Sequence, residues 1–299
     1  MFFIIMFTVP LASQIQKTDR GKIVFYPDFP SRYIVPRHIE IWLPEHYSSG
    51  GKFAVLYMHD GQMLYDAGTT WNKQSWNVDS TASALMSSGK IKDCIIVGIW
   101  NDQSTRHKDY FPAKPFNILT AEEKKWVTSE LLKNGRATEE FTVYSDDYLR
   151  FIVEELKPFI DSVYNVNTNK QNTFIAGSSM GGLISMYAVF EYPDIFGGAA
   201  CLSTHWPGVF TVENNPVPDA FVSYIKSGLQ NLRSNKIYFD HGDQTLDALY
   251  PPLQAKVNLA MQFYPEQFWV SRFFPGTDHS EKAWRERFGD VLVYLCSKE

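Results

Sequence analysis

The sequence predicts an α/β fold in which a mostly parallel, doubly wound sheet carries helices on both faces. Two patterns predict this fold. Short, continuous apolar runs alternate along the chain with longer segments of helical periodicity, and the motif Gly177-Ser178-Ser179-Met180-Gly181 stands where one such run gives way to a helical pattern. The chain has 299 residues, of which 44% are apolar, and this is enough for one large core.

The apolar runs between turn signals are typical of strands that are buried on both faces of a parallel sheet. They occupy residues 53–58, 94–99, 173–176, 198–202 and 236–240, and residues 267–274 form a further apolar strand. Two earlier runs, residues 22–26 and 38–43, alternate between apolar and polar side chains. We expect these two to open the sheet as antiparallel edge strands.

Helical segments fall between these strands. Apolar side chains recur at three- and four-residue spacing over residues 148–163, which predicts a helix with one buried face. Pro158 interrupts that pattern and is expected to kink or split the helix, because proline has no backbone N–H. A helical pattern follows the serine motif over residues 183–190, and a last helix over residues 284–295 begins after Ser280, a good N-cap.

We expect a single domain over residues 16–299, preceded by an apolar segment over residues 1–15. Residues 101–145 are longer and more polar than a minimal connection between sheet elements requires. They contain a helix that begins at Thr120, with Glu123 completing a capping box. Such an insertion is either a lid or substrate loop, or a packing excursion with no further role.

The opening segment MFFIIMFTVPLAS is apolar but shorter than the ~20 residues that cross a bilayer as a helix. It is similar to the hydrophobic part of a secretory signal, with Ser13 and Gln14 near a cleavage point, although no Lys or Arg precedes it. We therefore predict an exported, periplasmic or secreted protein without a stable membrane span. The alternative is a cytoplasmic protein with an apolar N-terminus.

Composition excludes several classes of partner. The net charge is -5 and no basic patch is visible, which argues against nucleic acid. Three cysteines, Cys94, Cys201 and Cys296, are far apart and odd in number, so neither a disulfide framework nor a zinc site is indicated. We expect no metal and no organic cofactor, because the sequence has no ligand spacing for either.

The motif around Ser179 has the form G-x-S-x-G, with a strand expected before it and a helix after it. In that context the serine sits on a strained strand-to-helix turn that exposes its hydroxyl, and small neighbours make the turn tight. Ser178 is adjacent, but only Ser179 has glycines at both flanking positions of the motif. We therefore predict Ser179 as a nucleophile.

A serine hydroxyl needs a base, and the base needs an acid to orient it. In this arrangement the acid and then the histidine follow the serine along the chain. His279 follows the last apolar strand and precedes the last helix, which makes it the predicted base. The acid should follow residues 236–240, where Asp243 and Asp247 compete and sequence chemistry does not separate them.

Backbone N–H groups are expected to bind the oxyanion. One belongs to Met180, the residue after the nucleophile. The other belongs to the loop that follows residues 53–58, where Gly61 permits close approach of the backbone, and we assign it to Gln62. Aromatic and histidine side chains in loops beyond strand ends are candidates for the substrate pocket, with core filling as the alternative reading: Trp71, Trp100, His205 and Trp206.

Several stretches taken in order resemble one esterase family of the α/β-hydrolase fold. They are VLYMHDGQMLYD, VGIWNDQSTRHKDYFP, FIVEELKPFID, FIAGSSMGGLISMYAVFEYPDIFGGAACLS and FPGTDHSEKAW, and together they run from about Phe53 to the C-terminus. The family includes enterochelin-esterase-like proteins, esterase D and S-formylglutathione hydrolases, feruloyl and acetylxylan esterases, and mycolyltransferases.

The resemblance implies an α/β-hydrolase with a Ser-His-Asp triad of Ser179, His279 and an aspartate. The branch with Leu-Asp before Ala-x-Tyr favours Asp247 as the acid, and the longer turn here leaves Asp243 as the alternative. Many members have His-Gly in this loop, whereas here Asp60 is inserted between His59 and Gly61. The position of the second oxyanion donor, assigned to Gln62, is therefore defined only to about one residue. The implied activity is hydrolysis of carboxylic esters, on carbohydrate-linked acetyl or feruloyl groups or on siderophores. An acyltransferase or a non-catalytic binding member is the alternative.

Overall fold

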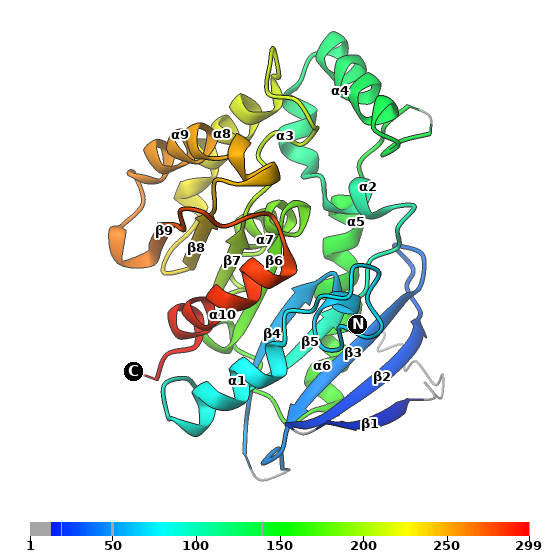
Figure 1. Cartoon of the computed structure of the whole chain (residues 1–299), viewed down its shortest axis with the longest axis vertical. Coiled ribbons are helices and arrows are strands. Elements are labelled where there is room, and N and C mark those ends of the chain that lie inside the picture. Colours follow the sequence, from blue (N-terminus) through cyan, green and yellow to red (C-terminus); the bar gives the residue numbers. More distant parts are fainter. Residues whose placement is uncertain (1–12, 19, 49–50, 139, 299) are drawn as a thin grey trace, which may run out of the picture.

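A computed structural model describes residues 13–18, 20–48, 51–138 and 140–298. Within these residues one nine-stranded sheet runs through the molecule in the order β1-β2-β3-β5-β4-β6-β7-β8-β9 (Figure 1). The strands are β1 (Gln14–Thr18), β2 (Gly21–Phe29), β3 (Arg37–Pro44), β4 (Ala54–His59), β5 (Cys94–Ile99), β6 (Thr173–Ser178), β7 (Gly198–Leu202), β8 (Lys236–His241) and β9 (Trp269–Phe273).

The strand directions confirm the predicted, mostly parallel sheet. Strands β4 to β9 pair in parallel, whereas β1, β2, β3 and β5 pair antiparallel in that order. The prediction that residues 22–26 and 38–43 form edge strands is wrong in position, because β1 pairs with β2 and is itself the edge. Of the apolar segment predicted over residues 1–15, Gln14 and Ile15 lie in β1, and residues 1–12 lie outside the described part.

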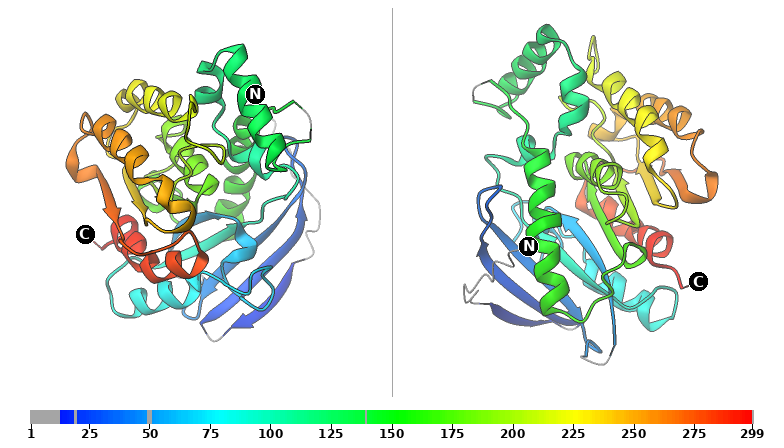
Figure 2. Two further views of the ribbon diagram at one scale, coloured as in Figure 1. Left: turned by 45° about the horizontal axis from the view of Figure 1, so that its top comes forward. Right: turned by 180° about the vertical axis from the view of Figure 1, so that it is seen from behind.

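Helices cover both faces of the sheet because alternate side chains of each central strand point to opposite sides. Leu56 of β4 packs in the apolar cluster of one face with α1 (Val78–Ser87) and α10 (Glu281–Cys296). Its neighbours Val55 and Tyr57 pack in the cluster of the other face. That face carries α5 (Ser145–Arg150), α6 (Lys157–Val163), α7 (Met180–Glu191), α8 (Val217–Gly228) and α9 (Pro251–Met261). Figure 2 shows α5 and α6 crossing it.

The helix expected over residues 148–163 is split at the point that Pro158 predicts. A π-helical turn, Phe151–Leu156, separates α5 from α6, and Pro158 lies in the first turn of α6. The wider π-helical turn accommodates Pro158. Proline donates no backbone hydrogen bond, and its ring crowds the carbonyl group one turn earlier in the helix. Short 3₁₀ turns complete the structure: η1 (Gly61–Met63), η3 (Lys170–Asn172), η4 (Leu229–Asn231), η5 (Thr245–Leu249) and η6 (Glu266–Phe268).

The segment predicted as an insertion contains three helices, α2 (Arg106–Tyr110), α3 (Ala113–Ile118) and α4 (Ala121–Lys133). In Figure 1, α3 and α4 project beyond the end of the sheet. The capping box at α4 is confirmed, since Thr120 accepts from the Glu123 N–H and Glu123 accepts from the Thr120 N–H. No helix in the described part of the chain is both long and apolar enough to cross a membrane.

Candidate active site

Ser179 occupies a tight turn between β6 and α7, as the motif predicts. Its backbone has φ 59° and ψ −122°, a conformation that costs a residue with a side chain on the order of 1–3 kcal/mol. A Cβ on Gly177 would lie 2.8 Å from the Gly181 backbone, so the turn needs glycine there. The Ser179 carbonyl accepts N–H bonds from Gly182 at 3.0 Å and His205 at 3.1 Å. These contacts hold the turn against the start of the helix.

His279 and Asp247 lie together although 32 residues separate them. His279 is in the loop between β9 and α10, and Asp247 is in η5, just after β8. The Nδ1 atom of His279 is 2.6 Å from Oδ1 of Asp247, and the His279 N–H donates to Thr245 Oγ1 at 3.0 Å. The Asp247 side chain is fully buried, whereas that of His279 is 13% exposed. The Nδ1 edge of the imidazole therefore contacts the acid, and the rest of the ring is partly exposed.

Asp243 has a different position. Its Oδ1 atom accepts from the Gly276 N–H at 2.8 Å and from Gln244 Nε2 at 2.9 Å. These bonds join the turn after β8 to the loop before His279. Of the two acids that the sequence left open, the structure brings only Asp247 to the imidazole.

Asp247 is held as an ionised acceptor. Burial alone would raise the pKa of its carboxyl group, but hydrogen bonds from His279, Ser203 and the Gly242 N–H outweigh burial and hold the pKa below its ordinary value. The Ser203 hydroxyl and the Gly242 N–H both reach Oδ2, at 2.6 Å and 2.7 Å. Because an ionised carboxylate only accepts hydrogen bonds, the proton of the His279 contact lies on Nδ1, which leaves Nε2 free to act as a base.

Tyr250 is a site residue that the sequence reasoning did not predict. Its buried hydroxyl is 2.9 Å from Nδ1 of His205 and lies near the Ser179 side chain, which lowers the pKa of Tyr250 slightly against the larger effect of burial. Its ring packs edge-on against His279, with centroids 5.7 Å apart. Asp247 and Tyr250 are three residues apart around a 3₁₀ turn, so their side chains share one side of it. The three-residue spacing from Asp247 was the sequence signal that could have pointed to Tyr250.

His205, a predicted pocket residue, is buried beside the nucleophile turn. Burial lowers the pKa of its imidazole well below the ordinary value, with smaller lowering contributions from His107, His279 and Arg106. Burial likewise raises the pKa of Tyr250 well above its ordinary range. The pair is thus a neutral imidazole and a neutral phenol next to the Ser179 hydroxyl.

The N–H groups of Gln62 and Met180 have no hydrogen-bond partner among the described residues. After β4, the N–H groups of Met63 and Leu64 bond to Asp60 and Gly61, but that of Gln62 has no hydrogen-bond partner among the described residues. Among the same residues the N–H of Met180, at the start of α7, also has none. Both predicted oxyanion donors are therefore available. A Cβ on Gly61 would lie 2.6 Å from the Gly98 backbone, which explains the glycine.

Asp60 ties this loop to the start of the insertion. Arg106 of α2 donates from Nε and Nη2 to its two oxygens at 2.8 Å and 2.7 Å, and Asn101 donates to Oδ1 at 2.7 Å. Burial alone would raise the pKa of Asp60, but its ion pair and hydrogen bonds with Arg106 outweigh burial and lower that pKa. Asp60 also has φ 56°, which Asp and Asn tolerate better than most residues.

The pairing predicts a pH-dependent stability for Asp60→Asn. A lowered native pKa contributes stability above the unfolded value, about 3.9, and this contribution is lost as pH falls through the native value. We expect the variant to lose roughly 1–3 kcal/mol of unfolding free energy at pH 7. The difference from wild type should narrow below about pH 4. Urea unfolding of both proteins at pH 7, 5 and 3 measures this, and a gap that stays constant over the series would contradict the assignment.

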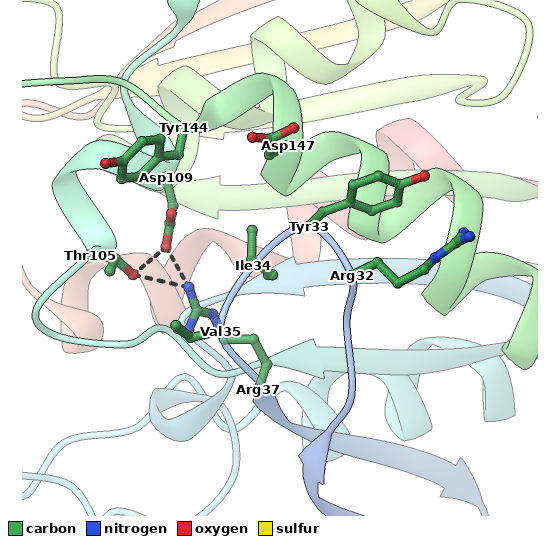
Figure 3. A pocket seen from close by; sticks show the side chains of 9 residues that line it. All are labelled: Arg32, Tyr33, Ile34, Val35, Arg37, Thr105, Asp109, Tyr144 and Asp147. Atoms are coloured by element: carbon green, nitrogen blue, oxygen red, sulfur yellow. Dashed lines mark hydrogen bonds and ion pairs between the residues drawn. The ribbon is translucent and has the colours of Figure 1, made fainter. Parts of the chain in front are cut away.

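The same helix is fixed on its other side. Asp109 and Thr105 of α2 bond to the buried Arg37 guanidinium at the start of β3, beside a surface cavity of about 390 Å³ (Figure 3). Figure 3 places Tyr33 and Tyr144 around this cavity. Helix α2 is thus held to the loop after β4 and to the antiparallel part of the sheet by separate ion pairs.

The three predicted pocket tryptophans lie in different environments. Trp71 is 81% exposed, on a loop that Asn72 fastens to Glu281 of α10 at 2.6 Å. Trp100 packs against Phe25 and His38 next to β5. Trp206 is buried, and its Nε1 donates to Gln254 at 2.8 Å. Of the three, only Trp71 is mostly exposed, and its neighbour Asn72 bonds to the first residue of α10, the helix that follows His279.

Comparisons with known proteins identify the family and the fold of the chain. A family model described as "Putative esterase" matches residues 35–295. The chain belongs to this esterase family. Its structural neighbours place it in the α/β-hydrolase-type fold: a ferulic acid esterase superposes with a TM-score of 0.64, at 18% identity, over 93% of this chain and 98% of that one.

Curated relatives of this esterase-family chain match over shorter stretches. The uncharacterized protein YbbA of Bacillus subtilis (strain 168) is 26% identical over 172 residues, 57% of this chain and 58% of that protein. The ferri-bacillibactin esterase BesA of the same organism is 32% identical over 143 residues, 46% of this chain and 44% of that protein. The matches thus span about half the length of these relatives.

Proposed function

We propose that this chain is a serine esterase that hydrolyses carboxylic esters with the triad Ser179, His279 and Asp247. The observation that carries the proposal is the 2.6 Å hydrogen bond between His279 and the buried Asp247. The strained turn at Ser179 and membership of the esterase family support it.

In this mechanism the Ser179 Oγ attacks the ester carbonyl carbon while Nε2 of His279 takes the hydroxyl proton. The oxyanion is bound by the N–H groups of Gln62 and Met180. As the tetrahedral intermediate collapses, the bond to the leaving alcohol breaks and His279 returns the proton to that alcohol. Water, deprotonated by His279, then attacks the acyl carbon; as this second intermediate collapses, the bond to Ser179 Oγ breaks, His279 returns the proton to Oγ, and the acid is released.

The resting arrangement has to change before the first step. The Ser179 side chain lies near the Tyr250 hydroxyl, and the hydrogen bonds of the described residues do not include a direct one from Ser179 to His279. Catalytic hydrogen bonds are often long or absent in ligand-free enzymes and form when substrate is bound. Rotation of the serine side chain within its turn brings its proton to Nε2.

The test is hydrolysis of p-nitrophenyl acetate and butyrate, with and without an added acceptor alcohol. Release of p-nitrophenol and free acid in water alone supports an esterase. Activity that requires the alcohol and yields a new ester would instead indicate acyl transfer. Absence of both products would overturn the proposal in favour of a binding role.

For the natural substrate we propose small-molecule or glycan-linked esters, either acetyl or feruloyl groups on carbohydrate or the ester bonds of a siderophore. The names of the ferulic acid esterase and of BesA support these two classes. The exposed Trp71 supports an aromatic or sugar ring at the mouth of the site, since both stack on an indole face. We also propose export, which N-terminal sequencing of protein recovered outside the cytoplasm would test.

The acid is distinguished by comparing Asp247→Asn with Asp243→Asn. We expect Asp247→Asn to lower kcat by roughly 10³- to 10⁴-fold, because the amide no longer holds the imidazole in its base tautomer. Asp243→Asn leaves that contact intact and should lower kcat by less than about tenfold. The kcat values of both variants on p-nitrophenyl butyrate measure the difference, and the reverse order would move the acid to Asp243.

A further inference from the structure

A buried polar cluster lies around Oδ2 of Asp247, the carboxylate oxygen that does not bond to His279. Its centre is Ser203, the residue that directly follows β7, and around it lie Asp240 of β8 and two residues of α10, Trp284 and Arg287. Each of the five residues is at most 5% exposed: Asp247, Ser203, Asp240, Trp284 and Arg287. The cluster is therefore closed to solvent, and its hydrogen bonds are made within the protein, although Arg287 Nε and Asp240 Oδ2 have no partner among the described residues.

The Ser203 hydroxyl has three partners. Trp284 Nε1 lies 3.0 Å from Oγ, Arg287 Nη2 lies 2.7 Å from it, and Asp247 Oδ2 lies 2.6 Å from it. A hydroxyl has one proton and two acceptor lone pairs, whereas an indole N–H and a guanidinium can only donate. Both lone pairs are thus occupied by donors, and the single proton can go only to Asp247. The direction of this hydroxyl is fixed before any substrate arrives.

The backbone of Ser203 aims the hydroxyl. Its φ is 40°, in the left-handed region that residues with a Cβ seldom adopt. Its N–H reaches both the carbonyl oxygen of Asp240 at 2.9 Å and the Oδ1 of the same residue at 3.1 Å. An unfavourable backbone conformation held by two bonds to one residue is typical of a position constrained by function.

The Ser203 hydroxyl also lies between the charged groups of Arg287 and Asp247. Arg287 Nη2 is 3.0 Å from Oδ1 of Asp240 but 4.0 Å from Oδ2 of Asp247. The guanidinium is thus paired with Asp240, and it reaches Asp247 through Ser203. Without the hydroxyl, the Gly242 N–H would be the remaining donor to Oδ2, and Arg287 could pair with Asp247 directly and turn its carboxylate away from His279.

We propose that Ser203 is a positioning residue that orients Asp247 and, through it, the base His279. The inference rests on the proposed esterase function for its kinetic consequence, but the positioning itself is a property of the hydrogen-bond network. It predicts that loss of one hydroxyl lowers turnover without weakening substrate binding, since the buried Ser203 bonds to Oδ2 of Asp247, the oxygen that does not bond to His279.

The test uses Ser203→Gly, with Ser203→Ala beside it. Glycine is comfortable at a φ of 40°, so Ser203→Gly removes the hydroxyl while relieving the backbone, and a loss of activity is then not a loss of folding. We expect kcat per active site, with sites counted by an arylphosphonate titration, to fall on the order of ten- to a hundredfold, with KM unchanged. Ser203→Ala should show the same fall.

Thr204→Val is the matched control. Thr204 is the next residue, is equally buried, and donates its hydroxyl to the Cys201 carbonyl and not to Asp247. It should keep the wild-type kcat. If Ser203→Gly also keeps the wild-type kcat on an ester that the wild type hydrolyses, Ser203 has no positioning role.

A proton NMR measurement separates this inference from the proposed function. The Nδ1 proton of His279 in its bond to Asp247 should give a strongly deshielded signal, assigned by its loss in Asp247→Asn. We expect that signal to shift upfield or broaden in Ser203→Gly and to stay in Thr204→Val. If the wild type hydrolyses no ester, the esterase proposal fails and this signal alone decides the positioning role. An unchanged signal in Ser203→Gly overturns it.

Discussion

Ser179→Ala should lower kcat/KM for p-nitrophenyl butyrate by roughly 10⁴- to 10⁶-fold while leaving the fold intact. The substitution removes the only atom proposed to bond to the acyl carbon. The residual rate would come from the oxyanion donors and from substrate binding. The hydroxyl also contacts Tyr250, but that contact is small beside the apolar core on which the fold depends. Steady-state kinetics and a thermal unfolding curve measure both expectations.

Ser178→Ala is the matched control for this prediction. Ser178 is the adjacent serine, is also buried, and ends β6, so its side chain is one position from the turn. We expect near-normal turnover and continued labelling by an arylphosphonate, which should not label Ser179→Ala. Near-normal turnover in Ser179→Ala would refute the mechanism, and loss in Ser178→Ala alone would move the nucleophile by one residue.

His279→Ala should be about as severe, roughly 10⁴- to 10⁶-fold in kcat/KM, because members of a triad act as one unit and their losses are not additive. The removed ring packs edge-on against Trp284 at 4.9 Å and near Tyr250, so the variant has a ring-shaped space beside Asp247. Added imidazole can enter that space and act as a base. We therefore expect partial recovery of kcat at millimolar imidazole.

Recovery of activity with added imidazole shows whether His279→Ala lacks only its base or has a disrupted active site. Imidazole should restore part of the activity of His279→Ala and none of that of Ser179→Ala, because the second variant lacks the nucleophile. An active His279→Ala without imidazole would show that another group takes the serine proton. His205 is the nearest alternative, since its Nδ1 already bonds to the Tyr250 hydroxyl next to Ser179.

Local sequence determines much of the fold because its signals do not depend on distant residues. Continuous apolar runs predicted β4 to β8, which are buried on both faces. The residues Thr120 and Glu123 predicted a helix start, and Pro158 predicted the division of a helix. The turn at Ser179 was predictable for the same reason, since its glycines and flanking elements lie within a few residues of it.

Features that depend on distant residues were not predictable in this way. The choice of Asp247 over Asp243 depends on which one meets His279, and only the packing of η5 against the loop before α10 decides it. Tyr250 and Ser203 reach the site from different strand ends, and neither residue belongs to a motif of its own. The edge strand β1 is polar at most of its positions, so its sequence lacks the apolar pattern that predicted the other strands.

The two ion pairs of α2 limit how this enzyme fold could be altered by exchange of parts. Arg106 fixes the helix to Asp60 in the loop after β4, and Asp109 fixes it to Arg37 at the start of β3. Beyond these anchors α3 packs against α8, with Phe116 buried in the core, whereas α4 extends past the end of the sheet (Figure 1). A chimera that replaces only residues 113–141 keeps both anchors, but it has to preserve the side chains of that segment that are buried in the core, such as Phe116, Leu119 and Phe141. One that also replaces α2 would need matching changes at positions 37 and 60.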